Sequence, residues 1–348
     1  MSDIELQPPA VLATILADQG LTRDQTARLF GQIMDGELDD PLKAGLLVAL
    51  AAKGESAEEI AGAAIAMRGR VVPVRCERKG LVDTCGTGGD RKGTFNISTA
   101  AALVAAAAGV PIAKHGNRAV SSRSGSADVF GALGVETEMS PVQAGRALDE
   151  IGLAFLFAPG FHPAMREVMP VRRSLGIRTI FNLLGPLTNP AGARRQVLGV
   201  YEAELVPRMA HVLTSLGCDH ALVVHGEDGL DELTTTAATL VAEVKGPKVE
   251  TFRLTPESLG LARVEMSALA GGDAESNAKM MRAVLQGEPG PLADITALNA
   301  AAALYVGGQV GDLREGLERA RDTLSRGEGL TKLEELREFS TRTGDDQA

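Results

Sequence analysis

Residues 81–113 decide the fold, and they read LVDTCGTGGDRKGTFNISTAAALVAAAAGVPIA. The apolar start, residues 81–84, predicts a short buried strand, and a glycine-rich loop follows it directly. Residues 97–108 are mostly alanine, leucine and valine and predict a buried helix, and residues 110–113 predict the next strand. A strand, a helix and a second strand in this order form the unit of a parallel α/β sheet.

The same alternation continues along the chain and predicts a large α/β domain with a mostly parallel central sheet. Residues 158–194 interrupt it with a stretch rich in proline and glycine, which we expect to be irregular. The C-terminal third is predicted to be helical. The further expected strands cover residues 153–157, 196–201 and 220–225, the expected helices cover 127–133, 141–151 and 205–216, and a hairpin that turns at Gly246-Pro247 covers 240–254.

The chain before this domain predicts only helices. Thr22-x-x-Gln25 and Ser56-x-x-Glu59 match the capping box that begins a helix, and apolar residues follow each motif at helical spacing. About four short helices therefore precede the first strand. They predict a small N-terminal helical domain, to which we assign residues 1–72.

The composition of the 348-residue chain excludes several classes of protein. Its 45% hydrophobic and 23% charged residues are typical of a globular protein with a sizeable core. A net charge of −10 and 3% aromatic residues argue against a nucleic-acid binder, which needs a basic surface and often stacks bases on aromatic rings. Three scattered cysteines, an N-terminus without signal-peptide features and no long apolar run lead us to expect a cytoplasmic protein without membrane contact.

The loop Asp83-Thr-Cys-Gly-Thr-Gly-Gly-Asp90 has three glycines close together, so several backbone N–H groups can turn toward one anion. It lacks the G-x-G-x-x-G of dinucleotide-binding proteins and the G-K-[ST] of a P-loop. Asn96, Ser98 and Thr99 follow at a predicted helix start, where N–H groups and the helix dipole favour phosphate. The alternatives are a tight turn for the glycines and simple N-capping for the polar residues.

A second polar loop runs from Lys114 to Asp128 and contains Arg118, Arg123 and four serines. It begins at the end of the strand that follows the glycine-rich loop. Because ligands of open α/β sheets lie beyond the carboxyl ends of the strands, we expect both loops to face one crevice and to bind phosphate. The alternative is a solvated polar loop, which would not need this density of hydrogen-bond donors.

Acidic residues follow a later strand, in His225-Gly-Glu-Asp-Gly-Leu-Asp-Glu232. Adjacent carboxylates in a glycine-bearing loop suit Mg²⁺, which proteins hold with one or two carboxylates together with substrate phosphates. An acidic turn is the alternative, but the two phosphate-type loops favour the metal.

Arg166, Arg172 and Arg173 cluster among prolines and glycines in the stretch 158–194. A guanidinium group can bind a carboxylate through two parallel hydrogen bonds. The alternative is that these arginines pair with acidic residues of the protein surface.

Taken in this order, the motifs resemble those of the anthranilate phosphoribosyltransferase family over roughly residues 8–340. The resemblance implies a nucleoside-phosphorylase-like phosphoribosyltransferase fold, in which residues 73–164 and 191–348 form the α/β domain. It also implies that about residues 165–190 complete the helical domain, which mediates a homodimer. The motifs that carry it are Asp83-Thr-Cys-Gly-Thr-Gly-Gly-Asp90, Asn96-Ile-Ser-Thr99, Lys114-His-Gly-Asn-Arg118, Val171-Arg-Arg173, Asn182-Leu-Leu-Gly-Pro-Leu-Thr-Asn-Pro190 and Asp228-Gly-Leu-Asp-Glu232.

The family transfers the phosphoribosyl group of 5-phosphoribosyl 1-diphosphate (PRPP) to the amine of anthranilate and releases diphosphate, the second step of tryptophan biosynthesis from chorismate. The resemblance implies two Mg²⁺ ions, held by Ser98, Asp231 and Glu232. It implies that Gly86, Asn117, His162 and Arg172 bind anthranilate, with Arg172 taking the carboxylate. The PRPP-binding residues would be Gly86, Gly89, Asp90, Thr94, Asn96, Ile97, Ser98, Thr99, Lys114, His115, Gly116, Asn117, Arg118, Ala119, Val120, Ser121, Ser122 and Ser126.

The amine of anthranilate is a weak nucleophile, so we expect catalysis to depend on the departure of diphosphate, through an oxocarbenium-like state. Asn117 and Arg172 would orient the amine, and we predict that no residue serves as a general base. Three alternatives remain open. The first is a pyrimidine nucleoside phosphorylase, which would use phosphate and would not need the Asp231–Glu232 pair for metal. The second is a nucleic-acid-binding relative of the same fold, which the net charge disfavours. The third is a non-catalytic structural protein, which has no use for converging phosphate loops.

Overall fold

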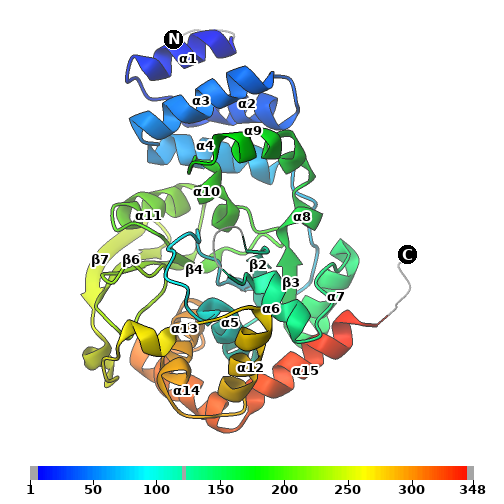
Figure 1. Cartoon of the computed structure of the whole chain (residues 1–348), viewed down its shortest axis with the longest axis vertical. Helices are drawn as coiled ribbons and strands as arrows, with labels where there is room; N and C mark the ends of the chain where they lie inside the picture. Colours follow the sequence, from blue (N-terminus) through cyan, green and yellow to red (C-terminus); the bar gives the residue numbers. More distant parts are fainter. Residues whose placement is uncertain (1–6, 120–122, 343–348) are drawn as a thin grey trace.

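The structure is a computed structural model, and it describes residues 7–119 and 123–342. Four helices form the N-terminal part, at the top of Figure 1: α1 (Pro8–Leu16), α2 (Arg23–Met34), α3 (Asp40–Lys53) and α4 (Ala57–Arg68). Both predicted capping boxes are present, because Thr22 and Ser56 accept hydrogen bonds from the backbone N–H groups of Gln25 and Glu59. The prediction of a small helical domain is therefore confirmed.

A seven-stranded sheet forms the centre of the larger part, in the order β3-β2-β1-β4-β5-β6-β7. The five strands from β3 to β5 are parallel, and β6 and β7 are antiparallel to their neighbours. The prediction of a mostly parallel sheet is confirmed. The strands are β1 (Val82–Asp83), β2 (Ile112–Gly116), β3 (Leu153–Phe157), β4 (Arg195–Gly199), β5 (His220–Gly226), β6 (Thr239–Lys245) and β7 (Lys248–Leu254).

The sheet separates two hydrophobic cores, which residues of β5 illustrate. Ala221 and Val223 belong to the core shared with the N-terminal helices, whereas Leu222 and Val224 belong to the other core. Successive side chains of a strand point to opposite faces, so this uninterrupted apolar run is buried on both sides.

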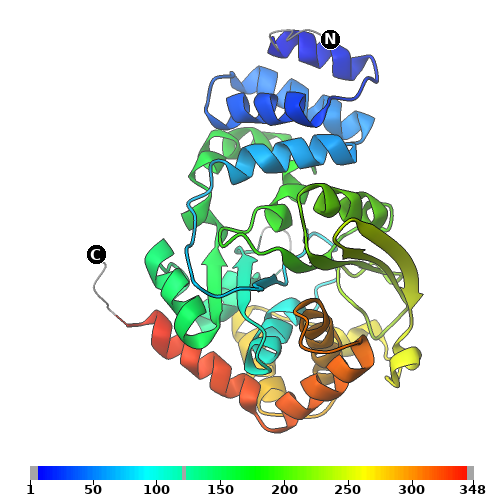
Figure 2. The same ribbon diagram turned by 180° about the vertical axis from the view of Figure 1, so that it is seen from behind.

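Helices cover both faces of the sheet (Figures 1 and 2). The helix α11 (Leu205–Ser215) packs on β5 and β6 on the side of the helical domain. The connection from β2 to β3 contains α6 (Ser126–Ala132) and α7 (Pro141–Ile151). The opposite face is covered by α5 (Ile97–Ala107), α12 (Ala274–Leu285), α13 (Pro291–Val306), α14 (Leu313–Ser325) and α15 (Glu328–Ser340).

Short helices replace the irregular chain that the sequence predicts over residues 158–194. Prolines occupy the first turns of several of these helices, where a missing N–H costs no hydrogen bond, so they begin helices here instead of interrupting them. The segments are α8 (Ala158–Phe161), η1 (Pro163–Glu167), α9 (Met169–Leu175), α10 (Phe181–Leu184) and η2 (Gly185–Leu187), with short 3₁₀ segments also at η3 (Pro256–Leu259) and η4 (Met266–Leu269).

The segment from α9 to α10 packs with the N-terminal helices although it is distant in sequence (Figure 1). Val168, Val171 and Ile180 lie in the same core as α2 and α4, and the rings of Phe30 and Phe181 are 5.4 Å apart. Across the described ranges, none of the helices combines the length and the apolar character needed to cross a membrane.

Candidate functional site

The site lies where the order of the parallel strands reverses, between β1 and β4. Open α/β sheets bind ligands beyond the carboxyl ends of the strands at such a point. The glycine-rich loop leaves β1 there and rests against the end of β4, because the Thr87 N–H donates to the Gly199 carbonyl over 2.8 Å. A Cβ at Gly199 would overlap the Asp231 carbonyl oxygen, so this close approach of two loops requires glycine.

The acidic loop after β5 packs directly on the glycine-rich loop. The Gly88 N–H donates to Asp231 Oδ2 over 2.9 Å, and a Cβ at Gly86 would lie 2.9 Å from the same oxygen. Gly88 and Gly89 both have positive φ, +64° and +80°, which other residues rarely adopt. The glycines thus do more than turn the chain, because they let backbone approach a carboxylate.

Three carboxylates lie close together here, and the charge of Asp90 contributes to raising the pKa of both Asp231 and Glu232. Burial, and then the charge of Asp90, raises the pKa of Asp231 to about 7. Burial, and then the charge of Asp231, raises the pKa of Glu232 to about 8, and a hydrogen bond with Ser98 partly offsets this rise. The three side chains therefore form a region of excess negative charge.

Lys114 is the buried cation beside these acids, with 2% of its surface exposed. Its Nζ donates to the Thr84 carbonyl over 2.8 Å and lies 3.5 Å from Ser98 Oγ. Burial lowers the pKa of the ammonium group, while the charges of Asp83 and Glu232 act in the opposite direction. One ammonium group cannot balance the neighbouring carboxylates, so a further cation would be stabilised here.

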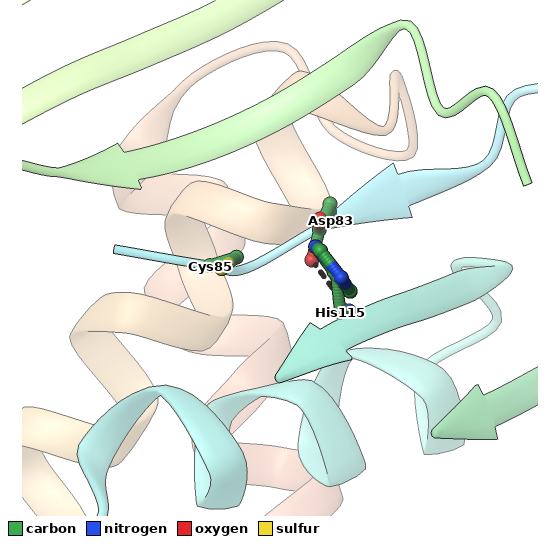
Figure 3. A group of neighbouring side chains, drawn as sticks. All are labelled: Asp83, Cys85 and His115. Carbon is green, nitrogen blue, oxygen red and sulfur yellow. Dashed lines mark hydrogen bonds between the residues drawn. The ribbon is translucent and has the colours of Figure 1, made fainter. Parts of the chain in front are cut away.

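The donor set fits Mg²⁺, because carboxylate and hydroxyl oxygens are its preferred protein ligands. Within the described residues, the three ligand-type side chains that lie within 4.8 Å of one another belong to another group, Asp83, Cys85 and His115 (Figure 3). The acidic residues of the loops are spread more widely than that. Such an arrangement suits ions that also take ligands from a bound phosphate compound.

The polar atoms of the Asp83–Cys85–His115 group have hydrogen-bond partners within the protein. Asp83 accepts from the His115 backbone N–H at 3.1 Å (Figure 3) and from Asn189 Nδ2 at 2.8 Å. The Cys85 thiol lies 3.6 Å from the Gly86 carbonyl, and burial raises its pKa far above the usual range. We interpret this group as a structural link between β1, β2 and the segment before β4.

The first turn of α5 carries several of the predicted phosphate ligands. Asn96 occupies the N-cap position but makes no side-chain cap bond, since its amide bonds the Ser124 carbonyl and the Asn277 side chain. Simple capping therefore does not account for Asn96. Ile97 and Thr99 are buried, at 2% and 1% exposure, and the Ile97 N–H donates to the Phe95 carbonyl.

Thr94 lies just before this turn and pairs with Ala270 in an isolated antiparallel bridge. Its carbonyl is packed against Gly271, where a Cβ would approach it to 2.5 Å. The bridge anchors the chain between the glycine-rich loop and α5.

The second polar loop is organised by Asp128, which the sequence analysis did not single out. Its Oδ2 accepts from the backbone N–H groups of Ala119 and Gly125 at 2.9 and 2.8 Å. A Cβ at Gly116 would overlap Ser126 Oγ, so the loop returns close to the end of β2. Asn117 and Arg118 are exposed, and the predicted ligands Val120, Ser121 and Ser122 lie outside the described residues.

His115 and His162 form a buried pair beside this loop, with their Nε2 atoms 3.2 Å apart. His115 Nδ1 lies 3.1 Å from the Gly185 carbonyl, which can only accept, so Nδ1 of His115 carries the hydrogen. In the neutral ring, His115 Nε2 then accepts from His162 Nε2–H. Burial lowers the pKa of His115 to about 3 and that of His162 to about 4.

Arg172 differs from the neighbouring arginine at position 166. Arg166 forms an ion pair with Glu167 at 3.1 Å, as the alternative of surface pairing predicts. Arg172 is half-buried on α9, lies over the ring of Phe181 at 5.8 Å and forms no ion pair with any described acidic residue. Burial lowers its pKa, so a carboxylate ligand would stabilise its charge.

Comparison with known proteins places the chain among glycosyl transferases. A family model for the helical bundle domain of a glycosyl transferase family matches residues 9–71, and a model for the a/b domain matches residues 78–330. The anthranilate phosphoribosyltransferase of Symbiobacterium thermophilum is 49% identical over 333 residues, which cover 96% of this chain and 98% of that protein. The one from Rubrobacter xylanophilus is 52% identical over 327 residues, 94% of this chain and 95% of that protein.

Solved structures agree with these similarities over nearly the whole chain. The anthranilate phosphoribosyltransferase of Thermus thermophilus superposes with a TM-score of 0.90 at 49% identity, over 94% of this chain and 98% of that one. The Saccharomyces cerevisiae protein in complex with PRPP and Mg superposes with a TM-score of 0.87 at 28% identity, over 97% and 98% of the two chains. Its complex with 4-fluoroanthranilate gives 0.85 at 28% identity, over 95% and 98%.

Proposed function

The chain belongs to the family of anthranilate phosphoribosyltransferases, and from that premise we propose how its own residues, with Mg²⁺, transfer the phosphoribosyl group of PRPP to the amine of anthranilate in tryptophan biosynthesis. One observation carries the proposal. At the reversal point of the sheet, a glycine-rich loop, a buried lysine and three mutually repelling carboxylates adjoin each other. Such a charge distribution suits a substrate that brings phosphates and a divalent cation together.

Ser98, Asp231 and Glu232 would hold Mg²⁺, as two ions, and Asp90 adds a third nearby carboxylate. When bound, Mg²⁺ neutralises charge that develops on the leaving diphosphate. Lys114 contributes a fixed positive charge from the buried side of the site. The N–H groups of the glycine-rich loop and of the first turn of α5 would bind phosphate oxygens.

The proposed PRPP site extends from this loop to the second polar loop. It is supported by the contacts that join the two loops to α5, such as the hydrogen bond from Asn96 to the Ser124 carbonyl. Its proposed members are Gly86, Gly89, Asp90, Thr94, Asn96, Ile97, Ser98, Thr99, Lys114, His115, Gly116, Asn117, Arg118, Ala119, Val120, Ser121, Ser122 and Ser126.

Arg172 would hold the carboxylate of anthranilate, and Asn117, Gly86 and His162 would line the rest of that subsite. The lack of an ion-pair partner for Arg172 among the described residues supports this role. In the reaction the amine nitrogen bonds to the anomeric carbon while the bond from that carbon to diphosphate breaks, and the amine loses its proton to solvent. We propose no general base, because orientation and departure of diphosphate supply the rate enhancement.

The helical domain is proposed to comprise residues 1–72 and about 165–190, and the α/β domain residues 73–164 and 191–348. The core that residues near Val168 and Ile180 share with α2 and α4 supports this division. We propose that the reaction takes place in the cytoplasm, which accords with the three free cysteines.

We further propose that the helical domain mediates a homodimer. Leu16, Val48 and Ile65 support this, because they are apolar and at least 41% exposed on helices of that domain. Leu16→Glu should convert a dimer to a monomer in light scattering after gel filtration. Val142→Glu is the matched control, since Val142 is also apolar and 59% exposed but lies on α7, in the other domain. Dissociation by the control alone would contradict the assignment.

An assay of the wild-type protein tests the central proposal. The protein is incubated with anthranilate, PRPP and Mg²⁺, and loss of anthranilate fluorescence is followed together with release of diphosphate. Both signals should change in equal amounts and only when all three components are present. A protein that consumes inorganic phosphate and a pyrimidine nucleoside instead would be a nucleoside phosphorylase.

A further inference from the structure

Arg178 connects the segment that carries Arg172 to the glycine-rich loop. It lies between α9 and α10, and Ile180, two residues later, is fully buried in the core of the helical domain. The Arg178 Nη2 group donates to the carbonyl oxygen of Gly89. The side chain therefore spans from the proposed anthranilate side of the site to the proposed phosphate side.

Two neighbours after β4 hold this guanidinium group in place. Its central carbon lies 3.8 Å from the ring centroid of Tyr201, and Nη1 lies 3.3 Å from Glu202 Oε1. Stacking on an aromatic ring while bonding through two edges is a property of the planar guanidinium group that a lysine cannot reproduce. The contact with Gly89 is thus made by a group with little freedom to move.

The bond to Gly89 determines which way the next N–H points. In a trans peptide the C=O of Gly89 and the N–H of Asp90 point in opposite directions. Because the carbonyl faces Arg178, the Asp90 N–H faces away from it. The N–H groups of Thr87 and Gly88 donate to Gly199 and Asp231, which lie in the α/β domain. Arg178, in contrast, binds the loop from the segment that packs with the helical domain.

We propose that Arg178 is a positioning residue that orients the Gly89–Asp90 peptide for the diphosphate and couples the PRPP subsite to the segment of α9. This inference rests on the proposed function. When α9 is held by anthranilate at Arg172, the Arg178 bond stabilises the loop conformation that binds PRPP. Occupancy of either subsite then favours occupancy of the other.

Arg178→Gln tests the role in steady-state kinetics. The KM for PRPP should rise about tenfold, the scale of one hydrogen bond from a charged group, with kcat within about threefold of wild type. In wild type the KM for PRPP should fall as anthranilate approaches saturation, and in the variant it should not respond. Arg178→Lys keeps a donor for the Gly89 carbonyl but loses the stacking on Tyr201, so its KM for PRPP should lie between those of wild type and Arg178→Gln.

Arg194→Gln is the matched control, because Arg194 also pairs with a carboxylate, Asp219 at 2.8 Å, and bonds a backbone carbonyl, that of Gly217 at 3.0 Å. Its KM for PRPP should equal that of wild type. A KM within twofold of wild type for Arg178→Gln, or an equal rise in the control, would overturn the inference. Wild-type protein without transferase activity would instead refute the proposed function.

Thermal melting separates a loss of positioning from a loss of folding. If Arg178→Gln shows no cooperative transition, Tyr201→Leu replaces it, since this change removes the ring beneath the guanidinium group and leaves Arg178 in the chain. Its KM for PRPP should rise about threefold, the scale of an exposed cation–π contact. An unchanged KM in a folded Tyr201→Leu protein would then overturn the inference.

Discussion

The two sides of the site differ in how they handle charge. On the proposed phosphate side, the carboxylates of Asp231 and Glu232 lie close together near Lys114 and repel each other. On the proposed anthranilate side, His162 is neutral and hydrogen-bonded to the neutral ring of His115, and Arg172 has no acidic partner among the described residues. The contrast indicates that the ionised carboxylates of one side are unfavourable without a further cation, whereas the other side combines the charge of Arg172 with two neutral histidine rings.

The largest expected effect comes from removing the charges of the phosphate side. Asp231→Asn combined with Glu232→Gln should lower kcat by about a thousandfold or more, because Mg²⁺ loses its proposed carboxylate ligands. In the presence of a chelator, the same change should raise the melting temperature by about 2 °C or more. The reason is that folding raises the pKa of each carboxyl, so the ionised form destabilises the folded state.

Glu227→Gln is the control for this double change. Glu227 lies in the same loop but is exposed and pairs with Arg253 at 2.5 Å. It should leave turnover unaffected. Full activity of the double variant with Mg²⁺ still bound, measured by titration calorimetry, would contradict the metal assignment and weaken the contrast between the two sides.

Removing the charge of Arg172, on the proposed anthranilate side, should have a smaller and more selective effect. Arg172→Gln should lower kcat/KM for anthranilate by about a hundredfold, the scale of a bidentate charged pair, and should change the KM for PRPP far less, by no more than the coupling through Arg178. The exposed neighbour provides the control, since Arg173→Gln should retain the wild-type kcat/KM. Equal losses toward both substrates would mean that Arg172 acts on the whole site and not on the carboxylate.

The histidine pair should show its effect in the pH dependence of stability. The folded-state pKa values of about 3 and 4 lie below the usual value of about 6.5, so the unfolded chain binds more protons between these limits. The free energy of unfolding should therefore decrease as the pH falls from about 6.5 toward about 4. His162→Gln keeps an N–H donor for His115 without a titrating ring and should reduce this slope by about 1 kcal/mol per pH unit.

Urea unfolding monitored at several pH values measures the slope. The readout is the difference between wild type and variant, since other groups titrate in the same window. Identical slopes would show that His162 takes up its proton over the same pH range in the folded and the unfolded protein, and the description of a neutral histidine pair would be wrong.

Much of the fold could be predicted because its signals are local. The helices at 141–151 and near 97–108, the strand at 153–157 and the hairpin end at Leu254 agree with the structure to within a residue or two. Capping boxes and apolar runs depend only on neighbours in sequence, so they can be recognised before the fold is known. The stretch 158–194 was predicted wrongly because its prolines start helices, a distinction that depends on what the short helices pack against.

The site was only partly accessible from the sequence. The glycine-rich and acidic loops attract notice by composition, and the structure brings Gly88 within 2.9 Å of Asp231. Asp128, Gly199 and Arg178 were missed, since each acts through a contact with a segment distant in sequence or through a close approach of backbone. A glycine at the end of a strand, facing an acidic loop, is the one signal that could have indicated Gly199.

The sequence by itself determined the α/β class, the helical start and the chemical types of residue that the site would offer. These properties follow from periodicity, capping and composition, which are short-range. Only the tertiary structure decided which groups meet: the carboxylates with the glycine-rich loop, His115 with His162, and Arg178 with Gly89. The physical reason is that these segments are distant in sequence and meet only in the folded chain. The strand order reverses between β1 and β4, and residues near Ile180 pack on the helical domain, so both features bring distant segments together.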